Sequence, residues 1–185
     1  MFSFDIQSGY HHDPIFPPHQ SFLGFSWCNK GKIRYFCFRV LPFGLSSAPY
    51  IFTKIFRPLV VHRRQQGIHI VVYLDHGFGE APSYQVPLDH STKVKLDLMH
   101  SGFVPNSDKS IWDPTLVIDW LGFTIDLFQG LIFIPGKKIK RVLSDVNSIL
   151  EANCSSAREL SALADRINSF SLAVGNATTL KTSFS

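Results

Sequence analysis

The chain has 185 residues, enough for one ordinary domain or for a core with a small helical appendage. Hydrophobic residues make up 45% of it and include 17 phenylalanines, which is ample for a packed core and argues against disorder. The formal net charge of +4 is a mild basic excess that suits an anionic partner but is too small to prove one.

The cysteines, Cys28, Cys37 and Cys154, are odd in number and lack CxxC spacing. This pattern predicts a reducing compartment, without structural disulfides or a thiolate zinc site. The polar start of the chain argues against a signal peptide, and no apolar run approaches the ~20 residues that span a bilayer. We therefore expect an intracellular protein of the cytoplasm or nucleus, or a piece of one, with no membrane partner.

The first predicted element is a half-buried strand over residues 1–6. Phe2, Phe4 and Ile6 fall on one face of this strand, and Ser3 and Asp5 fall on the other. Because the chain opens inside a strand, we expect that a segment is missing upstream.

The next predicted elements are a hairpin and a helix. Residues 22–27 and 35–40 flank turn-forming residues, which predicts two antiparallel strands. A helix is expected to follow Pro49 and to end at Gly67, with a kink at Pro58.

An apolar run over residues 67–74 is rich in β-branched residues and predicts a strand buried on both faces. We expect Asp75, Gly77 and Gly79 to make a tight turn into a return strand. Burying a lone carboxylate is costly, so Asp75 needs a cation or a hydrogen-bond partner.

Residues 80–90 are predicted to form a polar linker before a short helix over residues 92–100. Residues 116–125 and 131–134 are expected to form another hairpin.

From Lys137 the apolar period becomes helical and predicts an amphipathic helix with a basic first turn. A capping box at residues 156–159 opens a second helix, which Gly175 is expected to stop. The pair predicts a helical tail on an α+β body.

Two of the predicted strands each deliver an acid, Asp5 and Asp75. If these strands are neighbours in one sheet, the carboxylates converge and favour Mg²⁺. Paired Mg²⁺ ions stabilise the attacking and leaving oxygens of an in-line phosphoryl transfer. The alternative is that Asp5 caps a turn and that Asp75 stabilises its own tight turn.

Four motifs occur in the order and rough spacing of the palm motifs of reverse transcriptases. They are FDIQSGY at residues 4–10, LPFGLSSAP at 41–49, YLD at 73–75 and WLGF at 120–123. The runs SGYHH and SAPYIFTK resemble retrotransposon reverse transcriptases of the DIRS type in particular. The resemblance covers nearly the whole chain. It implies an α+β fold, with a palm over residues 1–135, whose central antiparallel sheet is flanked by helices, and a thumb-like helical segment over residues 136–185.

The resemblance implies a two-metal RNA-directed DNA polymerase that acts on an RNA template, a DNA primer and a deoxynucleoside triphosphate. Asp5 and Asp75 match the catalytic, metal-binding aspartates, and the Ile6 carbonyl matches a backbone ligand for Mg²⁺ or Mn²⁺.

Other motif positions match nucleotide and primer contacts. Tyr10 matches the bulky side chain that excludes a 2′-hydroxyl, although an ordinary buried tyrosine is the alternative. Lys109 is similar to a lysine near the leaving pyrophosphate, although a solvated surface lysine is the alternative. The remaining matches are Phe43 and Gly44 for the loop under the nascent base pair, and Trp120, Leu121 and Gly122 for the primer-gripping hairpin.

The chain departs from the family pattern at His76, where a second aspartate is usual, and at Leu116, where glutamine is common. We also expect the fingers to precede Met1 and a ribonuclease H region to follow Ser185 in a longer polyprotein. Imidazole removes a negative charge and is a ligand that Mg²⁺ disfavours. The sequence therefore predicts a degenerate fragment with weak or no activity.

Two alternatives use other residues. A catalytically dead remnant would at most bind nucleic acid, through the thumb-like helices and a face made by Arg63 and Arg64. A metal-binding protein would use histidines, and the candidates are His11, His12, His19 and His76. Adjacent His11 and His12 would point to opposite strand faces and could not easily share an ion.

Overall fold

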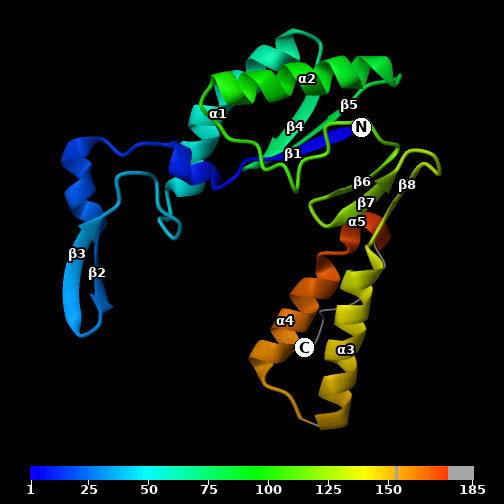
Figure 1. The fold of residues 1–185 in the computed structure, drawn as a ribbon. Coiled ribbons are helices and arrows are strands. Elements are labelled where there is room, and N and C mark those ends of the chain that lie inside the picture. Colours follow the sequence, from blue (N-terminus) through cyan, green and yellow to red (C-terminus); the bar gives the residue numbers. More distant parts are fainter. Residues whose placement is uncertain (153, 175–185) are drawn as a thin grey trace. The chain divides into compact units, whose positions relative to one another are not determined.

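The computed structural model of the chain describes residues 1–152 and 154–174. Its contacts divide the chain into two compact units, which we call unit 1 (residues 1–115) and unit 2 (residues 116–185) (Figure 1). The division between palm and thumb at residues 135 and 136 stays a prediction. Within the described residues, none of the helices has both the length and the apolar character needed to cross a membrane.

Unit 1 is built on a three-stranded antiparallel sheet with the strand order β1-β5-β4. The strands are β1 (Phe2–Asp5), β4 (His69–Tyr73) and β5 (His76–Glu80). Two helices, α1 (Ala48–Gln65) and α2 (Gln85–His100), lie on one side of this sheet in Figure 1. The predicted α+β fold, with a central antiparallel sheet flanked by helices, is confirmed.

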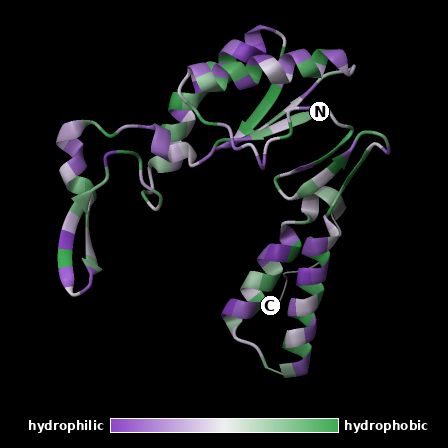
Figure 2. Ribbon diagram, in the orientation of Figure 1, coloured by the Kyte–Doolittle hydropathy of each residue, from purple (hydrophilic) through white to green (hydrophobic). Residues whose placement is uncertain are grey.

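The hydrophobic core of unit 1 lies between this sheet and the two helices. Phe2 and Phe4 of β1 meet Phe52 and Phe56 of α1 and Leu98 of α2, and all five are buried. Figure 2 shows the apolar residues of these elements. Burying side chains of this size contributes roughly 2 kcal/mol each.

Strand β1 is buried along its whole length, so the prediction of a half-buried strand is wrong. The physical reason is a segment that runs along its second edge. The Ser3 amide donates to the Ile111 carbonyl at 2.9 Å, and the Asn106 amide donates to the Asp5 carbonyl at 2.8 Å. Strand β1 is therefore an interior strand, and Asp5 becomes a buried acid.

Strand β4 is buried on one face only, so the prediction of burial on both faces is also wrong. Ile70 is buried, whereas Val71 and Tyr73 on the other face are exposed. Helices cover a single face of the sheet of unit 1, which leaves the alternate residues of β4 uncovered.

The turn between β4 and β5 differs from the prediction. Tyr73 pairs with His76, so Leu74 and Asp75 alone form the turn, and Leu74 adopts a φ of 53°. Gly77 lies inside β5. A Cβ atom there would lie 2.6 Å or less from three carbons of the Phe4 ring, so this glycine provides space for the core.

Gly79 has the same role one pair further along β5. A Cβ atom at this position would lie 2.9 Å or less from three carbons of the Phe2 ring. Because both glycines lack a side chain, the rings of Phe2 and Phe4 can pack directly against the backbone of β5.

The predicted first hairpin is confirmed as β2 (Gly24–Asn29) and β3 (Lys32–Cys37). Short 3₁₀ helices at Gly9–His12 and Pro17–Leu23 precede it. Helix α2 begins at Gln85, so the linker prediction is wrong over its second half.

In its described residues, unit 2 contains a three-stranded meander and three helices. The predicted single strand over residues 116–125 is wrong, because a turn at Leu121 and Gly122 (φ 48° and 80°) splits it. The elements are β6 (Val117–Trp120), β7 (Phe123–Asp126), β8 (Leu131–Phe133), α3 (Gly136–Ala152), α4 (Ala157–Asn168) and α5 (Ser171–Val174).

The capping box of α4 is confirmed. The Glu159 amide donates to Ser156 Oγ at 3.3 Å, and the Ser156 amide donates to Glu159 Oε2 at 2.7 Å. These bonds lower the pKa of the Glu159 carboxyl. The predicted stop at Gly175 lies outside the described residues, and α4 itself ends at Asn168.

Asp13 makes the stability of unit 1 depend on pH. This carboxyl is buried, and its Oδ2 has no hydrogen-bond partner among the described residues. Burial raises the pKa of Asp13 above its ordinary value of 3.8, although nearby His12 acts in the opposite direction. Between the ordinary and the raised pKa the folded state holds more protons than the unfolded state, so stability falls as the pH rises through this window.

We expect Asp13→Asn to remove this pH dependence and to raise the unfolding free energy at neutral pH. Urea unfolding at several pH values between 4 and 7 measures it. The matched control is Asp113→Asn, which changes an exposed carboxylate. A wild-type stability that rises with pH in a way that Asp13→Asn abolishes would contradict the assignment.

Candidate metal and nucleotide site

The backbone register brings two acids and a histidine to one end of the sheet of unit 1. Asp5 of β1 pairs directly with His76 of β5. The Ile6 amide donates to the Asp75 carbonyl at 2.9 Å, which ties the turn to the end of β1. The turn that carries Asp75 is therefore bonded to the end of β1, although β5 lies between β1 and the strand β4 that leads into this turn.

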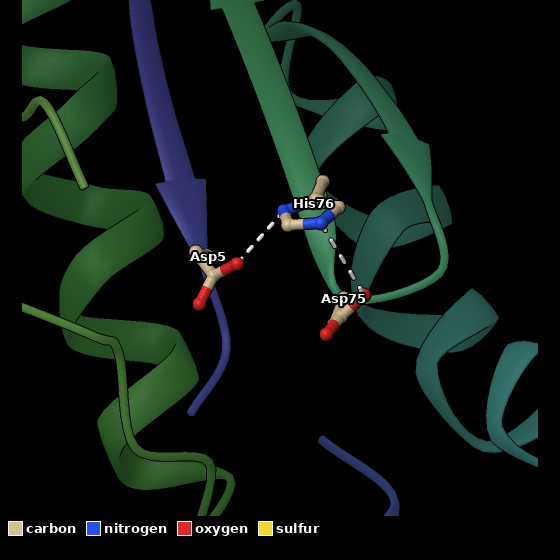
Figure 3. A group of neighbouring side chains, drawn as sticks. All are labelled: Asp5, Asp75 and His76. Carbon is tan, nitrogen blue, oxygen red and sulfur yellow. Dashed lines mark ion pairs between the residues drawn. The ribbon is translucent and has the colours of Figure 1, made fainter. Parts of the chain in front are cut away.

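In the cluster the imidazole of His76 lies between the two carboxylates (Figure 3). Its Nδ1 is 2.8 Å from Oδ2 of Asp5, and its Nε2 is 3.8 Å from Oδ1 of Asp75. One ligand atom from each residue lies within 4.8 Å of the other two. Within the residues that the structure describes, this is the one group of three such side chains. We call it the Asp5–Asp75–His76 cluster.

The buried Asp5 carboxylate fits a cation. Although His76 is near, Asp5 Oδ2 accepts no hydrogen bond from the described residues. Only 5% of the Asp5 side chain is exposed, compared with 35% for Asp75 and 42% for His76. A buried carboxylate oxygen without a hydrogen-bond partner is unfavourable, and a cation that reaches it from the exposed side would reduce that cost.

Tyr10 stands next to the cluster. Its ring packs against Phe43 and Phe52, with centroids 5.1 and 5.4 Å away. Burial raises the pKa of the Tyr10 phenol, and the charges of Asp75 and Tyr73 raise it further. The phenol therefore stays protonated at neutral pH and lies within electrostatic reach of the cluster.

Gly9 allows the loop after β1 to lie close to Phe52 and Asp75, a role that is not evident from the sequence. A Cβ atom at Gly9 would lie 3.1 Å from the Phe52 ring and 3.2 Å from the Asp75 Cβ. The sequence offered no signal for it, because glycine after a strand is ordinary loop chemistry.

Phe43 is 64% exposed beside Tyr10, which leaves its ring available to a ligand. Gly44 has a φ of 86° and open space around its Cα, so its backbone conformation alone favours glycine. Lys109 is exposed, and its Nζ is 4.0 Å from Asp5 Oδ2. Tyr10 and Lys109 thus lie beside the cluster, and Phe43 extends from Tyr10.

The predicted primer-contacting residues Trp120, Leu121 and Gly122 lie in unit 2, around the turn between β6 and β7. A Cβ atom at Gly122 would overlap the side chain of Lys138 from α3. The Lys138 ammonium lies 5.6 Å from the centre of the Phe123 ring. The positive charge of Lys138 therefore lies beside this turn.

The four-histidine alternative is wrong. His12 Nδ1 is 3.1 Å from the Gly9 carbonyl, and its Nε2 accepts a hydrogen bond from the Val104 amide. The His11 ring packs on Phe43, and the His19 ring packs against Phe16 and Phe22. None of these histidines joins His76 in a group of ligands within the described chain.

In the expected basic face of Arg63 and Arg64, the part of Arg63 is wrong, whereas Arg64 is exposed. Arg63 is buried, forms an ion pair with Asp97 of α2 and donates to Gln66 Oε1 at 2.5 Å. Arg64 Nε donates to the Ile70 carbonyl at 3.0 Å. Burial lowers the pKa of the Arg63 guanidinium, which serves to join α1 to α2.

Neither the known family models nor the curated proteins contain a match to this chain. Solved structures do match. A foamy viral protease-reverse transcriptase in complex with double-stranded DNA is 22% identical, with a TM-score of 0.70 over 90% of this chain and 26% of that chain.

Two further structures agree with this match. The foamy viral enzyme in complex with an RNA/DNA hybrid is 22% identical, with a TM-score of 0.69 over 90% of this chain and 20% of that chain. A prototype foamy virus protease-reverse transcriptase mutant is 26% identical, with a TM-score of 0.56 over 68% of this chain and 16% of that chain. The present chain spans about a quarter of the first of these solved chains and a smaller part of the other two. The similarity establishes that the chain has a reverse-transcriptase-like fold.

Proposed function

We propose that the chain is part of an RNA-directed DNA polymerase of a retrotransposon, of the DIRS type, with weakened nucleotidyl transfer. The observation that carries this proposal is the buried Asp5 oxygen without a hydrogen-bond partner, which lies in one group with Asp75 and His76 at the end of β1. The reverse-transcriptase-like fold supports it.

In this proposal Asp5, Asp75 and the Ile6 carbonyl hold Mg²⁺ or Mn²⁺. A bound dication supplies stabilisation of the negative charge that develops during phosphoryl transfer. Lys109 contributes a second positive charge, since its ammonium lies 4.0 Å from Asp5 Oδ2. Catalysis of this kind depends on positioning and on electrostatic stabilisation.

Tyr10, Phe43 and Gly44 bind the incoming nucleotide in this proposal. The exposed Phe43 ring offers a surface for a base, and the Tyr10 ring packs against it with centroids 5.1 Å apart. A bulky ring at this point limits the room for a ribose 2′-hydroxyl.

Unit 2 contacts the duplex of RNA template and DNA primer in this proposal. The turn at Trp120, Leu121 and Gly122 carries the charge of Lys138. The first turns of α3 add further cations, at Lys137, Lys140 and Arg141. Lysine and arginine side chains bind duplex phosphates and make the affinity fall with salt.

His76 weakens this activity. The imidazole stands where a third carboxylate would attract a second dication, and Mg²⁺ disfavours nitrogen ligands. Losing about 3–4 kcal/mol of transition-state stabilisation lowers the rate by roughly 10²–10³.

The second candidate function is nucleic-acid binding without turnover. The position of His76 favours it, because a ring within 2.8 Å of Asp5 Oδ2 occupies the approach to that oxygen. This candidate predicts duplex binding that weakens as salt rises, with no synthesis.

Primer extension distinguishes the two candidates. We expect the wild-type chain to show weak or no incorporation with Mg²⁺ or Mn²⁺. His76→Asp is expected to raise the affinity for the metal, and to give robust extension only when a fingers segment is supplied by fusion. Absence of extension from the fused His76→Asp variant, in either metal, would eliminate the polymerase proposal.

A further inference from the structure

We propose that the Asp5–Asp75–His76 cluster selects a first-row transition-metal dication, such as Zn²⁺ or Co²⁺, over Mg²⁺. His76 is the ligand that sets this preference. The inference rests on the proposed function, because it concerns the same cation site, and it assigns the chemical class of the ion.

The register in which β1 pairs with β5 places His76 in the cluster. Residues 5 and 76 are direct partners across β1 and β5, and directly opposed residues of an antiparallel pair share a face. A side chain at position 76 therefore lies on the same face of the sheet as the Asp5 carboxylate and next to it. Because 42% of the His76 side chain is exposed, an ion from solvent can reach it.

The three side chains are close enough to converge on one ion if they rotate slightly, because Nδ1 of the imidazole now faces Asp5 and Nε2 faces Asp75. His76 Nδ1 lies 2.8 Å from Asp5 Oδ2, and neighbouring ligand atoms on one ion with bonds of about 2.1 Å are about 3 Å apart. Asp75 offers a second oxygen, and one atom from each of the three residues lies within 4.8 Å of the others. The set of one imidazole and two carboxylates resembles the mixed nitrogen and oxygen sets that bind zinc in proteins.

A second observation points independently to an ion. Asp5 Oδ2 is buried, accepts no hydrogen bond from the described residues and faces the imidazole (Figure 3). Nearby Lys109, with its Nζ at 4.0 Å, is too distant for a hydrogen bond to this oxygen. An ion that enters between the imidazole and this oxygen would have it as its most enclosed ligand.

The ligand types then decide the preference. Mg²⁺ takes hard oxygen ligands and gives up its water reluctantly, whereas imidazole suits zinc and other late first-row dications. An aspartate at position 76 would restore an all-oxygen set and the preference for Mg²⁺. Residue 76 therefore acts as the selectivity determinant of the site.

Titration with Co²⁺, followed by visible ligand-field absorption, tests the inference on the whole chain. For the wild type we expect saturable Co²⁺ binding that Zn²⁺ displaces and that millimolar Mg²⁺ does not. His76→Gln is expected to lower the Co²⁺ affinity roughly tenfold or more. His76→Asp is expected to let Mg²⁺ compete with Co²⁺.

A control on the same hairpin excludes binding by any surface histidine. His69 of β4 lies 3.1 Å from Glu80, is exposed, and joins no third ligand in the described residues. His69→Gln is expected to leave the spectrum and the affinity unchanged. Loss of Co²⁺ binding in His69→Gln would overturn the inference.

Two results separate the inference from the proposed function. If wild type and His76→Asp bind Co²⁺ and Mg²⁺ with the same ratio of affinities, and Asp5→Asn weakens both, the preference is overturned while the cation site stands. If no dication binds to either protein in an Asp5-dependent manner, the inference and the proposed function are both overturned.

Discussion

Replacing Gly77 by alanine is expected to destabilise unit 1 by about 3 kcal/mol. The added Cβ would lie 2.6 Å or less from three carbons of the Phe4 ring, so either the ring or strand β5 must move. The ring has little room to move, because it is buried and stacks on Trp112 with centroids 5.8 Å apart. Urea unfolding followed by far-ultraviolet circular dichroism measures the loss.

Gly24→Ala is the matched control for this experiment. Gly24 also lies in a strand, and a Cβ atom there would meet its nearest neighbour at an ordinary 3.7 Å. We expect this variant to stay within about 0.5 kcal/mol of the wild type. Combining Gly77→Ala with Phe4→Leu should recover part of the lost stability. Equal stabilities of Gly77→Ala and Gly24→Ala would mean that Phe4 does not rest on β5 as described.

The second large effect is expected at Asp5. In the fused His76→Asp background that supports extension, Asp5→Asn should lower the rate roughly 10²–10³-fold, because it removes the most enclosed negative charge of the cation site. The fold should survive. Asp5 Oδ2 accepts no hydrogen bond, whereas the Asp5 backbone bonds to Ser110 and Asn106 are independent of the carboxylate.

Single-turnover primer extension measures this rate, with circular dichroism as the check on folding. The control is Asp108→Asn, which neutralises an exposed acid next to Lys109 without touching the cluster. We expect Asp108→Asn to extend primers like its parent. An Asp5→Asn variant that is folded and as fast as the parent would remove Asp5 from the catalytic assignment.

Local patterns in the sequence predicted most elements of the fold. The hairpin of β2 and β3 has turn residues at its tip, and the capping box at Ser156 and Glu159 marks the start of α4. These signals act between residues close in sequence, so they can be identified without knowing the tertiary structure.

Long-range packing explains what the sequence could not predict. The sequence predicts a turn role for Gly77, whereas in the fold this glycine leaves room for the ring of Phe4, which lies far away in the chain. The sequence predicts that Arg63 lies on the surface, whereas in the fold it is buried and forms an ion pair with Asp97 of another helix. Both errors come from contacts between distant segments, which local composition does not record.

The residues of the candidate site could be predicted from the sequence in part, but their arrangement could not. Motif resemblance selected Asp5 and Asp75, and it flagged His76 only as a departure. That the imidazole faces Asp5 follows from the register of β1 and β5, which the sequence alone did not give. The approach of Gly9 to Asp75 likewise depends on three-dimensional placement.

Paramagnetic broadening by Mn²⁺ in amide NMR spectra tests the central claim most directly, because it maps where a dication binds. We predict that substoichiometric Mn²⁺ broadens the amide signals of Asp5, Ile6, Asp75 and His76 before any others, and that Asp5→Asn abolishes this pattern. Broadening that begins elsewhere, or that persists unchanged in Asp5→Asn, would contradict a cation site at the end of β1.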